Sequence, residues 1–334
     1  MARERILSGM RPTGPLHIGH LLGALSNWRE LQDQYECYYM VADWHALMSE
    51  YAKPQAIPQN SIDNVVDWLA CGIDPSRSTI FVQSDVPEHA ELHLILSCLT
   101  PIPWLERVPT YKEQMQAITD KDLTNYAFLG YPVLQAADIL IYKASVVPVG
   151  EDQVAHLELT REITRRFNST YREVFPEPMP KLTQTPRLPG LDGRKMSKSY
   201  GNAVAIGEPP EETRRKIMSM FTDPQRLRRH DPGRPEICNV HTYYRTFAPE
   251  RVAEIDEGCR TGALGCVDCK KELAERLNAY LQPIRTKRTE LLARPGTVED
   301  ILKAGCKKAR RVAAATLNEA REAMGIGRSR IDVD

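Results

Sequence analysis

Two short segments of the chain carry residue types that could act on a phosphorylated substrate. The first, His17–His20, reads HIGH and places two imidazoles where a turn-rich loop gives way to a helical pattern. The second, Lys195–Ser199, reads KMSKS and carries two ammonium groups between Gly193 and Gly201. Helix N-termini and cations both stabilise phosphate charge. Because both segments occur in one chain, they predict a site that holds a nucleoside triphosphate between them.

The spacing within each segment supports this prediction. His17 and His20 lie three residues apart, so both face one side of the first helical turn, beside the positive end of the helix. The glycines around the second segment let a lysine loop close on a triphosphate as negative charge develops. Each segment alone also fits a pair of surface histidines or a solvated basic turn, so the prediction depends on the pair.

The elements that must position these segments alternate between strand and helix. Apolar runs indicate the strands, and apolar residues at helical spacing indicate the helices between them. The expected strands cover residues 5–8, 37–41, 79–82 and 146–149, and the expected helices cover residues 16–34, 54–71, 87–99 and 151–167. This alternation predicts an α/β fold with a doubly wound parallel sheet of the Rossmann type.

A change of pattern near residue 206 predicts a second domain. Strand signals nearly stop after residue 202, and the later segments that look helical are residues 211–220, 270–281 and 298–324. We therefore expect a Rossmann-type catalytic domain over residues 1–205, with an insertion at about residues 100–145. A helical domain is expected over residues 206–334, of which residues 325–334 have little helical pattern and are expected to form a tail.

Composition is that of a globular protein and gives no bulk sign of a nucleic-acid partner. The 334 residues include 44 basic and 44 acidic side chains, so the formal net charge is zero. Contact with nucleic acid would have to come from local clusters. The candidates are Arg214–Lys216, Arg226 with Arg228 and Arg229, and Lys307–Lys308 with Arg310 and Arg311. No apolar run approaches the roughly 20 residues that span a bilayer and no signal peptide is visible, so we expect a cytoplasmic protein without a membrane partner.

Four of the eight cysteines form a cluster in the second half of the chain: Cys238, Cys259, Cys266 and Cys269. Four thiolates suit a structural zinc ion or a [4Fe–4S] cluster, and the spacing does not separate the two. In a cytosolic protein, such a cluster favours metal over disulfide bonds. Four unliganded thiols are the remaining alternative.

Longer stretches around the histidine and lysine segments resemble a known family. The chain resembles the class I aminoacyl-tRNA synthetases, and more closely the bacterial tryptophanyl-tRNA synthetases, over nearly its whole length. The resemblance is carried by residues 8–14, 17–20, 105–107, 136–140, 147–153, 156–161 and 195–199. It implies activation of tryptophan with ATP and Mg²⁺, transfer of the acyl group to tRNA(Trp), a helical anticodon-binding domain and a homodimer.

The resemblance also implies roles for individual residues. Catalysis would depend on His17, His20, Lys195 and Lys198. ATP would contact Arg11, Pro12, Thr13, Gly19, His20, Gly150, Glu151, Asp152, Leu188, Lys195, Met196, Ser197, Lys198 and Ser199. Tryptophan would contact Leu7, His45, Tyr131, Gln135, Asp138 and Gln153, with Lys112 as a further candidate.

Asp138 also has a physical argument of its own. It lies in the apolar stretch 136–142, where an unpaired carboxylate would be costly. The resemblance implies that the indole N–H of tryptophan is its partner, and a neighbouring backbone amide is the alternative. Leu7 stands where tyrosyl enzymes carry a tyrosine for the substrate hydroxyl, which favours an indole. Gln135, in contrast, follows the tyrosyl pattern.

The cysteine cluster resembles that of a minority of tryptophanyl enzymes, which bind a [4Fe–4S] cluster in the helical domain. On that ground we favour iron–sulfur over zinc. A tyrosyl-tRNA synthetase is the nearest alternative function. A nucleotidylyltransferase and a metal-cluster RNA-binding regulator are the alternatives from other classes.

Overall fold

The structure is a computed structural model that describes residues 3–109, 124–150, 153–182, 188–197, 200–294 and 296–327. Its centre is a five-stranded sheet in which the paired strands are parallel and the order is β3-β2-β1-β4-β5. The strands are β1 (Arg5–Met10), β2 (Glu36–Val41), β3 (Ser78–Val82), β4 (Val146–Val149) and β5 (Met179–Leu182). This topology confirms the predicted α/β class with a Rossmann-like sheet.

Some strands can be recognised from their apolar residues, and others cannot. In β2, the residues from Cys37 to Val41 are buried, as expected for a parallel strand that lies between two helical layers. The sequence analysis missed β5, because this edge strand contains Pro180 and its ends, Met179 and Leu182, are more than half exposed. β5 forms by pairing with β4.

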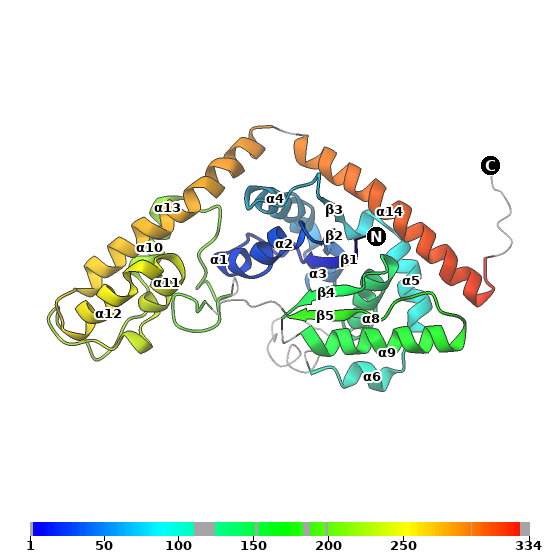
Figure 1. Cartoon of the computed structure of the whole chain (residues 1–334), viewed down its shortest axis with the longest axis horizontal. Helices are drawn as coiled ribbons and strands as arrows, with labels where there is room; N and C mark the ends of the chain where they lie inside the picture. Colours follow the sequence, from blue (N-terminus) through cyan, green and yellow to red (C-terminus); the bar gives the residue numbers. More distant parts are fainter. Residues whose placement is uncertain are drawn as a thin grey trace.

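Helices cover both faces of the sheet (Figure 1). The helices of this part of the chain are α1 (Ile18–His20), α2 (Ser26–Leu31), α3 (Asp43–Glu50), α4 (Ile57–Ala70), α5 (Glu88–Ser97), α6 (Ile102–Glu106), α8 (Tyr126–Ile141) and α9 (Val154–Thr170), with 3-10 turns at Pro54–Ala56 and Gln83–Asp85. Trp28 of α2 and Trp68 of α4 belong to one buried cluster. Leu92 of α5, Leu140 of α8 and Ile163 of α9 belong to the other.

The helical stretch after β1 is not regular. One helix is expected over residues 16–34, but α1 passes into a π-helical turn at Leu21–Leu25 before α2 begins. The carbonyl of Leu21 accepts both the backbone N–H of Ser26 and its hydroxyl, the latter at 2.7 Å. π-helical turns are frequent at functional sites, and this one directly follows His17–His20.

The later part of the chain is helical. Its elements are α10 (Pro210–Met218), α11 (Asn239–Phe247), α12 (Val252–Arg260), α13 (Cys266–Leu292) and α14 (Thr297–Met324), with 3-10 turns at Pro235–Ile237 and Pro249–Arg251. The long helix α13 packs against α10 and α11 and also reaches α4 of the sheet domain. There, Nε of Arg288 donates to the carboxylate of Asp67 at 2.8 Å. α13 therefore connects the helical region to the sheet.

The last helix, α14, leaves the helical region. The sequence analysis places it in the domain over residues 206–334, whereas in the structure it packs against β3 and α5 (Figure 1). Its buried face includes Leu302, Cys306, Ala309, Ala313, Leu317 and Ala320. Gly305 allows the close approach, because a Cβ there would lie 1.7 Å from the carbonyl oxygen of Ile80. The sheet is thus covered by both the beginning and the end of the chain.

Candidate active site

The strand order creates a crevice beside β1. Since β2 and β3 lie on one side of β1 and β4 and β5 on the other, the chain reverses its winding direction there, and ligands of such sheets bind at the carboxyl ends of the strands at this point. A cavity of about 290 Å³ occupies this position. Its lining includes the predicted residues Leu7, Arg11, His45, Tyr131, Gln135, Asp138 and Gln153. The fold therefore brings into one cavity residues that lie far apart in the sequence.

The His17–His20 segment starts its helix through its own side chains. Nδ1 of His17 accepts the Gly19 N–H at 3.1 Å, and Nδ1 of His20 accepts the His17 N–H at 3.1 Å. Because Nδ1 is the acceptor in each ring, the proton of a neutral imidazole sits on Nε2, which is then a donor suited to phosphate. Gly19 is required by close packing, since a Cβ there would lie 2.9 Å from the His17 ring.

The lysine segment lies against the histidine segment. The Ile18 N–H donates to the carbonyl of Val204, just beyond the loop, at 3.0 Å. Met196 is buried, and its Sδ is 3.5 Å from the position that a Cβ on Gly19 would occupy. The two segments singled out in the sequence are therefore neighbours in the fold.

Asn202 holds the backbone of the lysine loop. Its side chain is buried, its Oδ1 accepts the Ser197 N–H at 2.8 Å, and its Nδ2 donates to the Asp192 carboxylate at 2.8 Å. Nδ2 also donates to the carbonyl of Lys195 at 3.2 Å. A Cβ on Gly190 would lie 2.2 Å from this amide, so the turn depends on glycine there. The backbone at Lys195 and Ser197 is thus held, whereas the Lys195 side chain is exposed.

Asp138 provides a buried negative charge at the cavity. It lies in α8 with 1% of its surface exposed, and Nε2 of His45 donates to its Oδ2 at 2.8 Å. Burial alone would raise the pKa of Asp138, but hydrogen bonds from His45 and His89 outweigh it and hold the pKa well below its usual range. The carboxylate is therefore ionised and acts only as an acceptor.

A second polar chain lines the same cavity. Nδ1 of His156 lies 3.0 Å from Oε1 of Gln153, and its Nε2 lies 2.7 Å from the hydroxyl of Tyr131. The amide oxygen can only accept, so His156 donates from Nδ1 and its neutral Nε2 accepts from the Tyr131 hydroxyl. These two hydrogen bonds hold the side chains of Tyr131 and Gln153 at the cavity.

Comparison with known proteins decides the family. The family model described as tRNA synthetases class I (W and Y) matches residues 2–282. The chain belongs to this family. The synthetase is 54% identical over 325 residues to the tryptophan–tRNA ligase of Thermotoga maritima, an alignment that covers 96% of this chain and 99% of the relative. It is 44% identical to the tryptophan–tRNA ligase of Aquifex aeolicus, with 96% of this chain and 100% of the relative covered.

A solved structure gives the same result for the synthetase. The tryptophanyl-tRNA synthetase from Campylobacter jejuni complexed with ADP and tryptophan has a TM-score of 0.87 and 34% sequence identity, and the match covers 96% of this chain and 100% of that one. The predicted membership in the class I synthetases is thereby confirmed.

The remaining predicted site residues are absent from the cavity lining or lie outside the described part. The N–H of Thr13 donates to the carbonyl of Arg11 at 2.9 Å, Pro12 and Leu188 are buried, and Gly150 follows the end of β4. The predicted residues that lie outside the described residues are Lys112, Glu151, Asp152, Lys198 and Ser199.

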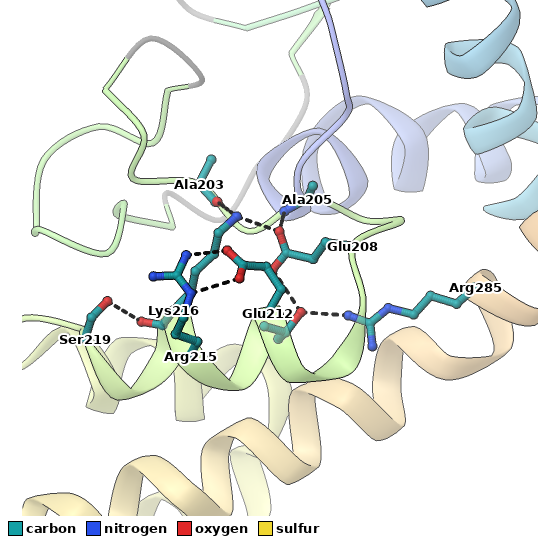
Figure 2. A network of polar contacts seen from close by, with 9 residues as sticks. Ala203, Ala205, Glu208, Glu212, Arg215, Lys216, Ser219 and Arg285 are labelled. Carbon is teal, nitrogen blue, oxygen red and sulfur yellow. Dashed lines mark hydrogen bonds and ion pairs between the residues drawn. The ribbon is translucent and has the colours of Figure 1, made fainter.

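A buried ion pair anchors the far end of the lysine loop to the helical region (Figure 2). Oε2 of Glu208 accepts the Ala205 N–H at 2.9 Å and the Lys216 ammonium at 2.6 Å. Lys216 also donates to the carbonyl of Ala203 at 2.9 Å. Arg285 of α13 joins the network through the hydroxyl of Thr213, which in turn donates to Glu208. The segment that pairs with the histidine motif is therefore tied to α10 and α13.

The Glu208→Gln variant tests this anchor. We expect it to lower the free energy of unfolding by about 2–3 kcal/mol, because the amide removes the charge that a largely buried Lys216 needs. Urea unfolding followed by circular dichroism measures the change. The matched control is Glu212→Gln, whose exposed pair with Arg215 lies on the same helix and is expected to contribute nothing measurable. Equal losses in the two variants would contradict the assignment.

The sequence analysis did not predict a role at the site for six residues: Gln83, His89, Tyr142, His156, Asn202 and Glu208. Gln83 directly follows β3, and polar residues at the carboxyl end of a parallel strand lie at the ligand edge, so that position carried a usable signal. His89 lies in an α5 sequence with charged neighbours, which looks solvent-exposed. Nothing in its pattern shows that it is fully buried.

The cysteine cluster is only partly as expected. All four thiols, Cys238, Cys259, Cys266 and Cys269, line one small cavity with apolar walls. However, within the described part of the chain no three or more His, Cys, Asp or Glu side chains are grouped closely enough to hold a metal ion. The expected metal centre is therefore not formed by these side-chain positions. Nη1 of Arg226 donates to Sγ of Cys259 at 3.7 Å and so places a cation at the cluster.

Proposed function

We propose that this synthetase is a tryptophan–tRNA ligase that forms tryptophanyl-adenylate from L-tryptophan and ATP and then charges tRNA(Trp). The relatives named above support the proposal, since they match over nearly the full length of both chains. The structural neighbour from Campylobacter jejuni binds ADP and tryptophan, which are the ligand classes that the crevice beside β1 would accept.

The observation that carries the amino-acid assignment is the ionised Asp138 in a cavity whose lining also includes apolar side chains. Leu7 and Ile139 line this cavity and suit a flat apolar ring. A carboxylate can only accept, so Asp138 favours a ring that carries a donor, and an indole has one, its N–H. With a leucine at position 7, a phenol hydroxyl would lack one expected partner. Tyr131, Gln135 and Gln153 then remain for the ammonium and carboxylate of the amino acid.

The phosphate side of the proposed site consists of the two segments from which the argument began. His17 and His20 would donate from Nε2 to the phosphates, with Gly19 and residues 11–13 beside them. Lys195 and Lys198 would bind the departing pyrophosphate. Gly150, Glu151, Asp152 and Leu188 are proposed for the adenosine, and Met196, Ser197 and Ser199 for the rest of the lysine loop's contacts.

No side chain needs to act as a nucleophile. A carboxylate oxygen of tryptophan attacks the α-phosphorus, a new P–O bond forms, and the bond to the pyrophosphate oxygen breaks. Catalysis is then positioning and charge stabilisation. Mg²⁺ would neutralise phosphate charge; the one carboxylate among the described cavity residues, Asp138, is already bonded, so we infer that the ion arrives on ATP.

Amino-acid-dependent ATP–pyrophosphate exchange tests the proposal. Exchange with tryptophan but not tyrosine is the expected result. Exchange with tyrosine alone would replace the proposal with a tyrosyl enzyme, and exchange with neither would favour the metal-cluster RNA-binding regulator. Charging of tRNA(Trp) transcripts tests the second step.

We also propose a cytoplasmic homodimer. Among the described residues, no helix is both long and apolar enough to cross a membrane. The proposed substrates, tRNA and ATP, are present in the cytoplasm. Leu94, Ile102 and Tyr126 are exposed by 65%, 60% and 71% on helices α5, α6 and α8, of which α8 contacts both of the others. Light scattering is expected to give twice the chain mass, and a Leu94→Glu variant is expected to shift it toward the monomer.

For tRNA contact we propose the basic clusters named from the sequence. In the structure some residues of these clusters form ion pairs with acidic side chains. Nε of Arg310 donates to Glu88 at 2.9 Å, and Arg229 pairs with Asp268. Phosphate contacts are salt-dependent, so charging should weaken with salt more than pyrophosphate exchange does.

The four cysteines are proposed to hold a [4Fe–4S] cluster, with structural zinc as the alternative. The proposal is supported by the shared position of the four thiols, which line one cavity. Burial raises the pKa of Cys269 to about 12, so binding a metal centre would release thiol protons. Iron in anaerobically purified protein would support the cluster, zinc without iron would favour the alternative, and neither metal would contradict both.

The Cys266→Ser variant separates the role of the cluster from that of the active site. We expect pyrophosphate exchange to survive and tRNA charging to fall, because Cys266 lies at the start of α13 in the helical region. Both activities are measured on the same preparation. The control is Cys98→Ser, which changes an exposed cysteine outside the cluster. Equal loss of both activities in the Cys266 variant would contradict a role directed to tRNA.

A further inference from the structure

The carboxylate of Asp138 is bound from behind as well as from the cavity. Nδ1 of His89 lies 2.6 Å from its Oδ1, and Nε2 of Gln83 donates to the same oxygen at 2.8 Å. Both side chains are fully buried, and neither lines the cavity, whereas Asp138 and His45 do. Oδ1 is therefore saturated on the protein side.

The hydroxyl of Tyr142 determines which ring nitrogen of His89 carries the proton. This hydroxyl is buried at the end of α8 and lies 2.7 Å from Nε2 of His89, its one hydrogen-bond partner among the described residues. Burial and the charge of Asp138 raise the pKa of Tyr142 well above its usual value. The phenol is thus protonated and donates to Nε2, which leaves the proton of the neutral imidazole on Nδ1, directed at Asp138.

These bonds leave a defined acceptor. A carboxylate has about four lone-pair positions. Two on Oδ1 are taken by His89 and Gln83, and one on Oδ2 is taken by His45. The position that remains is on Oδ2, the oxygen whose bonded partner, His45, lines the cavity.

We propose that His89, held by Tyr142 and assisted by Gln83, is a positioning residue for amino-acid selection: it locks Asp138 so that Oδ2 presents one acceptor to a substrate N–H. This inference rests on the proposed activation of tryptophan. His89 touches no substrate. It prevents the Asp138 carboxylate from rotating, and it occupies Oδ1 so that this oxygen cannot accept the substrate N–H. The site therefore recognises a donor at one position on the substrate ring.

The test compares tryptophan with its benzothiophene analogue, in which sulfur replaces the indole N–H. The ratio of kcat/KM for the two substrates in ATP–pyrophosphate exchange measures recognition of the N–H. In His89→Leu this ratio is expected to fall by about 10- to 100-fold, mainly through tryptophan. In His89→Asn the ratio is expected to stay closer to that of the wild type, because the amide can restore a donor near the Nδ1 position.

A structural role alone would lower kcat/KM for both substrates equally and leave the ratio unchanged, and that outcome overturns the proposal. If the wild type activates tryptophan but does not distinguish the analogue, Asp138 is not the N–H acceptor and the proposal also fails. If the wild type activates no tryptophan, the proposed function itself fails.

A milder variant covers the case in which His89→Leu does not fold. Tyr142→Phe removes one oxygen and retains the ring, which is stacked on Tyr38 with centroids 4.6 Å apart. We expect the same ratio to fall by a smaller factor, and an unchanged ratio overturns the proposal. Thermal unfolding of each variant shows that the folded enzyme is being compared.

Discussion

The Lys195→Ala variant is expected to lower the kcat of tryptophan-dependent pyrophosphate exchange by about 100-fold, or about 2.7 kcal/mol of transition-state stabilisation. Lys195 is exposed, and the loop backbone around it is held by Asn202 and by the buried Met196. The substitution therefore removes an ammonium without releasing the loop. The KM for tryptophan should stay within about twofold, because the lost interaction belongs to the departing pyrophosphate.

The control for this variant lies one residue away. Arg194 has the same charge as Lys195 and lies in the same loop. Its guanidinium, however, pairs with Asp192 and lies 4.7 Å from the centre of the Tyr200 ring. Arg194→Ala is expected to change kcat by a few-fold at most. A similar loss in both variants would show that loop structure, rather than the charge at position 195, determines the rate.

How far the sequence predicts the site depends on what kind of signal each residue gives. Asp138 was predictable, because a carboxylate in an apolar stretch needs a partner. His89 gave no such signal, since its helix has charged neighbours and its burial depends on α8, which lies across a long connection. Glu208 looked like one of many surface acids, and only the fold shows that it is buried beside Lys216.

The same reasoning explains the differences in the fold. The inner strands are apolar runs, which can be recognised from the sequence alone. The edge strand β5 lacks such a run, and its extended conformation depends on its pairing with β4. The helical period of α14 predicts that one face is buried but carries no information on its partner. The sequence analysis assigned this helix to the helical domain over residues 206–334, whereas in the structure it packs against β3 and α5.

The Gly305→Ala variant is expected to destabilise the protein although alanine is the better helix former. Helix propensity alone would favour alanine by about 1 kcal/mol. In the structure, however, the new Cβ would lie 1.7 Å from the carbonyl oxygen of Ile80 and 2.7 Å from its carbonyl carbon. These are backbone atoms of β3, which cannot rotate away. We expect a net loss of at least about 2 kcal/mol in the free energy of unfolding, measured by urea denaturation.

Gly130 is the matched control, because it is also a buried glycine in a helix. A Cβ there would meet only Cε1 of His93 at 3.8 Å, an ordinary contact. Gly130→Ala is therefore expected to leave stability unchanged or raise it by up to about 1 kcal/mol. Opposite signs at the two positions would establish that α14 is seated directly on β3. A stabilising Gly305→Ala would mean that α14 does not pack there, and the assignment of the last helix to the sheet domain would be wrong.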